Sequence, residues 1–459
     1  MHAGYGFPSA VRAARARSAC TAVVAACAAL VVATLPARAA TPTAAATPSP
    51  QGAEGAPLSP PRPLPLAWCL ERAAVANPDI AELAALLDAA GERIAQAGAL
   101  EDVRFAYEAS NVPTGTFDFD STMMSGHQLG LRQQLPFPGL LASRERAAER
   151  GRDAAAFAVA NRERTVASAV EVAWAELGYA QRALAITDRN LELLRQLASA
   201  AEAKYAVGSG MQADVLRAQV ELTSLLEMRL AHEARVEAAN ARLVALLDLP
   251  PATALPPTAS GDEPPPAPAL APLLARLASS SPLLEGLAAQ VEQQRHAVDA
   301  AELEGLPDVD VGIGYRVRSS VPGDPVRGDD FLSAGVTVRL PVNRARWRAH
   351  AAEQRALLRA AEARLRSQTA AASARARDAH AALARADAAL ALLRTGLVPQ
   401  AAQSFEASRS AYEVGRLDFT DVLESQMRLL DVEVRAERAR ADRHAGWAGL
   451  EAVVGADLR

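Results

Sequence analysis

The chain carries the same series of sequence signals twice, about 205 residues apart. Each series holds a helix start marked by proline, an alternating strand pattern, a Leu-Pro joint and a Tyr-x-Val-Gly turn followed by Asp-Val-Leu. The matched pairs are Asn77-Pro78 with Ser281-Pro282, residues 103–109 with 309–317, Leu135-Pro136 with Leu340-Pro341, and Tyr205-x-Val207-Gly208-x5-Asp214 with Tyr412-x-Val414-Gly415-x5-Asp421. Four unrelated signals at nearly one offset are hard to obtain by chance, so we expect two copies of one structural unit.

The expected unit is a helix, a β-hairpin with a long loop, a very long helix and a return helix. We assign it to residues 64–249 and 273–459, joined by a proline-rich linker over 250–272. Asn77 and Ser281 suit the N-cap, and the proline after each suits the first helical position. The expected strands are about 102–110 and 125–135 in the first copy, and 308–318 and 331–340 in the second.

The clearest strand pattern covers residues 309–318, where apolar residues alternate with charged residues and glycines. A period of two with one apolar face predicts a strand rather than a helix. At roughly 9–11 residues, each strand has the length of a tilted membrane-spanning β-strand. We expect the face with Ile313 and Val336 to meet lipid and the face with Gly314 and Arg316 to meet water.

A helical segment of unusual length follows each hairpin, over residues 139–204 and 342–411. Each would span about 100 Å if continuous, at 1.5 Å per residue. Gly396 and Pro399 predict a kink or break in the second segment. Both segments stop at Val-Gly, where Gly208 and Gly415 predict helix-tip turns.

The N-terminal residues 1–39 are predicted to be a secretory signal peptide, with an arginine-rich start, an uncharged apolar stretch and a small-x-small exit. A membrane anchor, or lipidation at Cys27, are the alternatives. Residues 40–63 are expected to form a disordered Pro/Ala-rich leader. Cleavage would leave Cys69 as the last cysteine, so no intramolecular disulfide is expected.

The composition favours long helices, and the net charge of −5 argues against a nucleic-acid partner. Four membrane-length strands cannot close a barrel by themselves, and an open edge in lipid would leave backbone groups unsatisfied. Closure therefore needs several chains: two would give eight strands, and three would give twelve with room for a lumen. Helices of about 100 Å exceed a bilayer of about 30 Å and must project into the periplasm.

On the doubled Tyr-x-Val-Gly…Asp-Val-Leu turns and the strand–proline–long-helix joints, the chain resembles outer-membrane efflux proteins of the TolC family. The resemblance covers about residues 64–454. It implies a mainly α fold with membrane β: long coiled-coil helices forming a periplasmic α-barrel, and a trimeric 12-stranded outer-membrane β-barrel. It also implies a homotrimer that contacts outer-membrane lipid and serves as exit duct for a periplasmic adaptor and an inner-membrane pump, of the RND type.

Within the family, Glu108, Asn111 and Pro113, together with the run 134–139, resemble the CzcC/CusC-like heavy-metal branch. Short Pro-Gly joints also occur in drug and solvent exporters, so a drug, solvent or type I secretion duct is the alternative. The sequence does not give the substrate, because the pump selects it.

The resemblance places a periplasmic aperture, or pore gate, at Asp214, Tyr412, Asp421 and Glu424. The simpler interpretation of the two aspartates is favourable charge in the first turn of a return helix. For Tyr205 we expect packing between helices. The basic partner usual near the second turn is absent, because Leu417 stands there with Arg416 one residue earlier.

No catalytic motif is present, and we expect neither an enzyme nor a bound cofactor or metal. The histidines show no metal-ligand spacing. The competing function from another class is a pore-less periplasmic coiled-coil scaffold or adaptor. The strands with one charged face argue against it.

Overall fold

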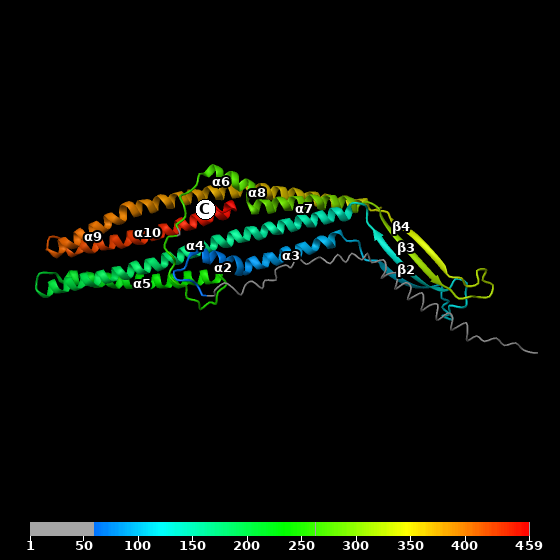
Figure 1. Ribbon diagram of the computed structural model, residues 1–459, viewed down its shortest axis with the longest axis horizontal. Coiled ribbons are helices and arrows are strands. Elements are labelled where there is room, and N and C mark those ends of the chain that lie inside the picture. The colour runs from blue at the N-terminus through cyan, green and yellow to red at the C-terminus, as the bar shows by residue number, and fades with distance from the viewer. Residues whose placement is uncertain (1–58, 262, 459) are drawn as a thin grey trace, which may run out of the picture. The chain divides into compact units, whose positions relative to one another are not determined.

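The chain folds into two copies of the expected unit (Figure 1). The computed structural model describes residues 59–261 and 263–458, so the expected signal peptide and most of the expected leader lie outside the described residues. The first copy comprises α2 (Leu66–Ala76), α3 (Pro78–Gly98), β1 (Arg104–Ser110), β2 (Gly126–Leu135), α4 (Leu140–Ala206) and α5 (Gln212–Leu246). The second comprises α6 (Leu270–Ser280), α7 (Pro282–Glu304), β3 (Asp308–Val317), β4 (Phe331–Arg339), α8 (Arg344–Leu392), a π-helical turn (Leu393–Leu397), α9 (Val398–Glu413) and α10 (Phe419–Val454).

The two helix starts marked by proline differ in their capping. Asn77 Oδ1 accepts a hydrogen bond from the backbone N–H of Asp79 at 3.0 Å, as the sequence predicts. Ser281 occupies the corresponding N-cap position, but its side chain forms no capping bond to α7. The capping prediction for Ser281 is therefore wrong, and Pro282 and the acidic Glu285 in the first turn supply the helix-start signals there.

The long helix of the first copy is continuous, whereas its counterpart in the second copy is interrupted. α4 runs without a break for 67 residues. The π-helical turn interrupts the second helix at Gly396, just before Pro399, where the sequence predicts a break. Proline cannot donate the i→i−4 hydrogen bond, and a local π-helical turn accommodates this loss.

The four strands form one antiparallel sheet in the order β1-β2-β3-β4. The register pairs Phe105 with Leu131, Leu131 with Ile313, and Ile313 with Ala334 across the sheet. Within the described residues, the outer edges of β1 and β4 have no partner strand. The mainly α fold with a small four-stranded sheet is as predicted.

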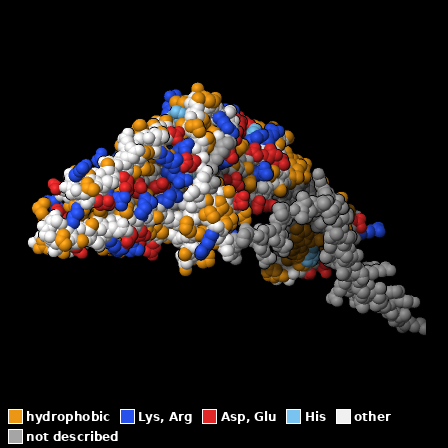
Figure 2. Space-filling model, turned by 60° about the vertical axis from the view of Figure 1, so that its left-hand side comes forward, with side chains coloured by type: hydrophobic (Ala, Val, Ile, Leu, Met, Phe, Trp, Pro, Cys, Tyr) orange, Lys and Arg blue, Asp and Glu red, His pale blue; other side chains and the backbone are white. Residues whose placement is uncertain are grey.

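Helix α4 is the element on which both copies pack, because it contacts α3, α5, α7 and α10. Trp174 of α4 is buried, and its Nε1 donates a hydrogen bond to the carbonyl oxygen of Leu64 at 3.0 Å. Toward the helical turns a second apolar cluster joins α4 and α5 to α9 and α10. Acidic and basic side chains are interspersed over the visible helical surface (Figure 2). Charged side chains are mostly exposed to solvent in folded proteins, so this helical surface is suited to contact with water.

The predicted linker packs against the helices. Leu64 forms a parallel bridge with Thr258, and the backbone N–H of Thr258 donates to Gln181 of α4 at 3.0 Å. A Cβ on Gly178 would lie only 2.6 Å from Thr258 Oγ1, so glycine gives the linker room to cross α4. The linker also ends earlier than expected, because α6 begins at Leu270.

Glu263 anchors the middle of this linker to three arginines. Its carboxylate lies 2.6 Å from Arg394, 3.2 Å from Arg443 and 3.5 Å from Arg440. The hydrogen bond from Arg394 holds the pKa of Glu263 below its usual range, although burial opposes the shift and the charges of Arg440 and Arg443 assist it. Glu263 therefore joins the linker to the second copy's long helices.

We predict that Glu263→Gln lowers stability at neutral pH by about 1 kcal/mol, as expected for a partly exposed ion-pair network. Because the folded-state pKa is depressed, the stabilisation is present above the unfolded pKa of about 4.3 and is lost as pH falls through the folded value. Urea unfolding in detergent at several pH values measures both effects. If the wild type and the variant differed in free energy of unfolding by the same amount at the lowest pH as at neutral pH, this role would be contradicted.

Candidate functional site

The two helical turns place the predicted tip residues at the ends of α4–α5 and α9–α10, away from the sheet (Figure 1). Gly208 has φ of 73° and Gly415 has φ of 74°, a left-handed conformation that glycine adopts without steric cost. Asp214 lies in the first turn of α5 and Asp421 in the first turn of α10. The turns therefore form as predicted.

Tyr412 is the centre of the contacts between the two turns. It is 7% exposed, and its ring packs edge-on against Phe419 with 5.7 Å between ring centroids. Lys204, at the end of α4, places its Nζ 3.7 Å from the centroid of the Tyr412 ring. The same Nζ donates a hydrogen bond to the carbonyl oxygen of Tyr412 at 2.6 Å. Lys204 thus binds the first turn to the second through a cation–π contact and a hydrogen bond.

Burial raises the pKa of the Tyr412 phenol, and the negative charge of Asp214 raises it further. The structure therefore brings together two of the predicted gate residues from different copies. Because the shift is upward from a value of about 10, the phenol stays neutral at physiological pH.

A second contact between the copies joins Arg217 of α5 to Thr420 of α10, where the guanidinium donates to the Thr420 hydroxyl. Sequence reasoning missed both Lys204 and Arg217, because it sought the basic partner within the second turn, at Arg416 and Leu417. One signal was available: Lys204 is the only lysine in the chain. At the corresponding positions of the second copy stand Ala411 and Glu424.

Asp421 and Glu424 are both exposed on α10. Their spacing of three residues makes them neighbours on the helix surface. Neither forms an ion pair within the part of the chain that the structure describes. Glu424 lines a hollow between α5 and α10 together with Leu216, Val220, Leu423 and Met427.

Tyr205, expected to pack between helices, is instead 48% exposed. The corresponding Tyr412 is buried, so the two tip tyrosines have different environments in the single chain. Among the described residues, a cation contacts the ring of Tyr412, and none contacts the ring of Tyr205.

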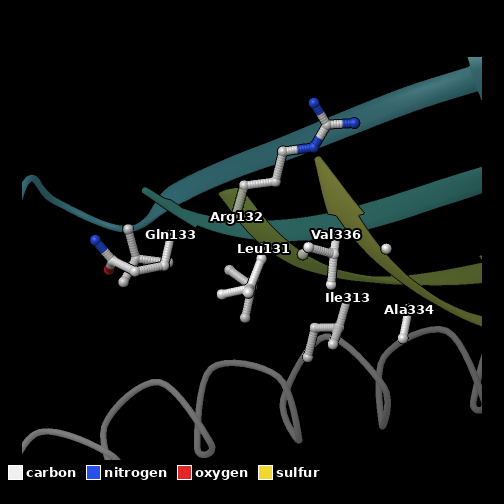
Figure 3. Close-up of a pocket in the computed structure, with 10 residues that line it drawn as sticks. Leu131, Arg132, Gln133, Ile313, Ala334 and Val336 are labelled. Atoms are coloured by element: carbon white, nitrogen blue, oxygen red, sulfur yellow. The ribbon is translucent and has the colours of Figure 1, made fainter. Parts of the chain in front are cut away.

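The sheet has two chemically different faces. Leu131, Ile313 and Ala334 lie side by side on one face, while Arg132 extends from the opposite face (Figure 3). Arg132 of β2 pairs with Gly312 of β3, which in turn pairs with Gly335 of β4. The strands therefore alternate between an apolar and a polar face, as the sequence predicts.

The polar face is internally hydrogen-bonded. Arg316 of β3 donates to Gln128 Oε1 of β2 at 2.7 Å, and Gln134 Nε2 donates to Asp308 at 3.1 Å. A Cβ on Gly314 would lie 2.8 Å from Ser333 Oγ, so this face is crowded between β3 and β4. The polar groups of this face are suited to line an aqueous lumen.

The family model for outer membrane efflux protein matches residues 69–248 and 273–456, one stretch in each copy. The chain belongs to the outer membrane efflux protein family. Its members are channels of the outer membrane with a periplasmic extension, and they work in tripartite systems with an adaptor and a pump. The resemblance inferred from the duplicated turns is confirmed, and this chain is an outer-membrane efflux protein.

Solved outer-membrane channels share the fold. VceC from Vibrio cholerae superposes with a TM-score of 0.71 at 17% identity, covering 86% of this chain and 97% of that one. CusC gives 0.72 at 15% identity, covering 85% and 92%. The open state of MtrE from Neisseria gonorrhoeae gives 0.70 at 16% identity, covering 86% and 89%. No curated protein has a significantly similar sequence.

Two features are absent from the described residues. They contain no helix that is both long enough and apolar enough to cross a membrane. They also contain no group of three or more His, Cys, Asp or Glu side chains placed to hold a metal ion.

We predict that neighbouring residues of β4 respond oppositely to arginine. Val336→Arg places a charge on the apolar face and should cost roughly 2–4 kcal/mol near the bilayer midplane, whereas Thr337→Arg on the polar face should cost little. Urea titration of the protein folded into lipid vesicles measures both. Equal destabilisation by the two variants would invalidate the assignment of the faces.

Proposed function

We propose that this efflux protein is a passive homotrimeric exit duct, without catalysis, that receives its cargo from an RND-type pump through a periplasmic adaptor. The observation that carries the proposal is the two-faced sheet, whose edges at β1 and β4 have no partner strand among the residues that the structure describes. Four strands from each of three chains would close a twelve-stranded barrel and pair every edge in lipid. A pore-less scaffold would have no use for a sheet that is apolar on one face and polar on the other.

The helical turns at the far end of the long helices would form the periplasmic aperture. Threefold symmetry would place three copies of Asp421 and of Glu424 around one axis. Both carboxylates are exposed and without an ion-pair partner in the described chain, so they are available to face a pore. Rings of Asp or Glu concentrate cations and favour them in a pore.

For the cargo we propose heavy-metal cations, which an anionic aperture would favour. The support is the resemblance of the first hairpin and joint to the heavy-metal branch, together with the exposed acidic pair on α10. The competing proposal is that the duct exports drugs or solvents, or serves type I secretion. The fold is compatible with each of these cargoes. A passive duct need not ligate the cation.

We predict that a trivalent cation added from the periplasmic side blocks the wild-type channel, and that Asp421→Ala with Glu424→Ala relieves the block. The reason is the loss of six carboxylates, two from each of three chains, at the narrowest point. Single-channel conductance in planar bilayers measures the effect.

The matched control is Glu227→Ala with Glu237→Ala on α5, two exposed carboxylates without an ion pair among the described residues, which should leave the block unchanged. Both variants should assemble as the wild type does. If the wild type and the Asp421/Glu424 variant were blocked equally, these carboxylates would only stabilise the start of α10.

We predict that Lys204→Met raises the open fraction of the channel about fivefold. The substitution removes a cation–π contact worth roughly 0.5–2 kcal/mol, which holds the two turns together. Lys204→Arg retains a cation and should stay close to the wild type. Because Lys204 is the only lysine, acetylation of the folded wild type should reproduce the Met variant and leave the Arg variant unaffected. An unchanged open fraction in the Met variant would remove Lys204 from gating.

A further inference from the structure

The joint between β4 and α8 combines exposed apolar and exposed basic side chains. Leu340 is 67% exposed and Val342 is 86% exposed, and both follow directly on the apolar face of β4. Arg344 and Arg348 come next, in the first turns of α8, and both are exposed. The apolar surface that meets lipid in the outer membrane thus continues into a basic surface within a few residues.

Nothing in the described chain neutralises these two arginines. Neither forms an ion pair with a carboxylate among the described residues, and the first turn of α8 holds no acidic residue. Two like charges four residues apart lie on the same face of a helix and destabilise it. Positive charge is also unfavourable at the start of a helix. Helix stability therefore does not explain their presence.

Trp347 fixes the rotation of α8 at this joint. Its Cβ lies 3.3 Å from the position of a Cβ on Gly305, so the indole packs where α7 ends. The guanidinium of Arg346 lies 5.0 Å from the centroid of the Trp347 ring, and that of Arg339 lies 5.8 Å from it. Arg346 has an aromatic partner, and its position two residues from Arg344 and Arg348 places it on nearly the opposite helix face.

The first copy of the unit lacks this feature. Counted from the Leu-Pro joint, Gly139 and Ser143 stand at the positions of Arg344 and Arg348. Arg144 and Arg146 follow at other positions of that helix, and Arg144 is paired with Glu304 of α7 at 2.7 Å. The basic pair thus belongs to the second copy alone, and duplication of the fold does not account for it.

We propose that Arg344 and Arg348 bind the phosphate of an anionic phospholipid headgroup, with Leu340 and Val342 against its acyl chains. Arginine suits this role because its guanidinium binds phosphate in a bidentate manner and its apolar stem lies along hydrocarbon. The site serves to fix the depth of the strand–helix joint in the membrane. It depends on the outer-membrane location of the family and not on the proposed trimer, cargo or gate.

The test is native mass spectrometry of the full chain in detergent, titrated with phosphatidylglycerol or phosphatidylcholine. Basic residues near an anionic lipid surface contribute about 1 kcal/mol each, which is about fivefold in affinity. Arg344→Gln with Arg348→Gln should therefore weaken phosphatidylglycerol binding on the order of 25-fold. Phosphatidylcholine binding should weaken much less, because the positive choline group offsets the charge of its phosphate. Raised salt should reduce the wild-type preference.

Two further variants make the result specific. Arg346→Gln removes one charge from the other face of the same helix and should leave the preference intact. Arg344→Lys with Arg348→Lys retains the charge and should keep most of the binding, which guards against misfolding of the glutamine variant. A large loss in Arg346→Gln, or full binding by the double glutamine variant, would overturn the proposal.

Two more outcomes would assign the arginines elsewhere. If inorganic phosphate displaced the lipid at millimolar concentration, the site would be one for a free anion. If the double glutamine variant lost its assembly with other copies while Arg346→Gln retained it, the arginines would be a subunit contact. Either result would overturn lipid binding, and neither would affect the predicted block of the channel by a trivalent cation.

Discussion

A β-sheet in hydrocarbon must satisfy every backbone N–H and C=O group internally, and this requirement governs the rest of the structure. Each chain supplies one sheet of four strands, whose edges at β1 and β4 find no partner among the described residues. Under the proposed trimer, the missing partners come from other copies. In that assembly the polar face would enclose water, and the long helices attached to both hairpins would continue the same passage outside the membrane.

The two copies share one architecture and differ in the side chains at their turns and joints. Tyr412 is buried under Lys204 and beside Phe419, whereas the equivalent Tyr205 is half exposed. A cation contributed by the first copy holds the turn of the second, so the contact cannot be formed by either copy alone. The joint at α8 follows the same pattern, because its basic pair has no counterpart at the start of α4.

The linker between the copies is also part of the packing. Glu263 faces three arginines of the second copy, while Thr258 contacts Gln181 in the first. Gly178 of α4 provides space for the linker to cross. The linker is thereby joined to α4 in the first copy and to the π-helical turn and α10 in the second.

The sequence by itself determined the elements and their order, because those depend on local chemistry. Period-two alternation, Val-Gly stops and the Gly396–Pro399 break each act within a few residues of chain, and the structure confirms them. The sequence did not give the partners of the tip residues. Lys204 and Tyr412 lie 208 residues apart, and the basic group came from the other copy of the unit. Only the packing of α4 against α10 decided that pairing, because a contact between distant segments depends on how whole helices align and not on any local pattern.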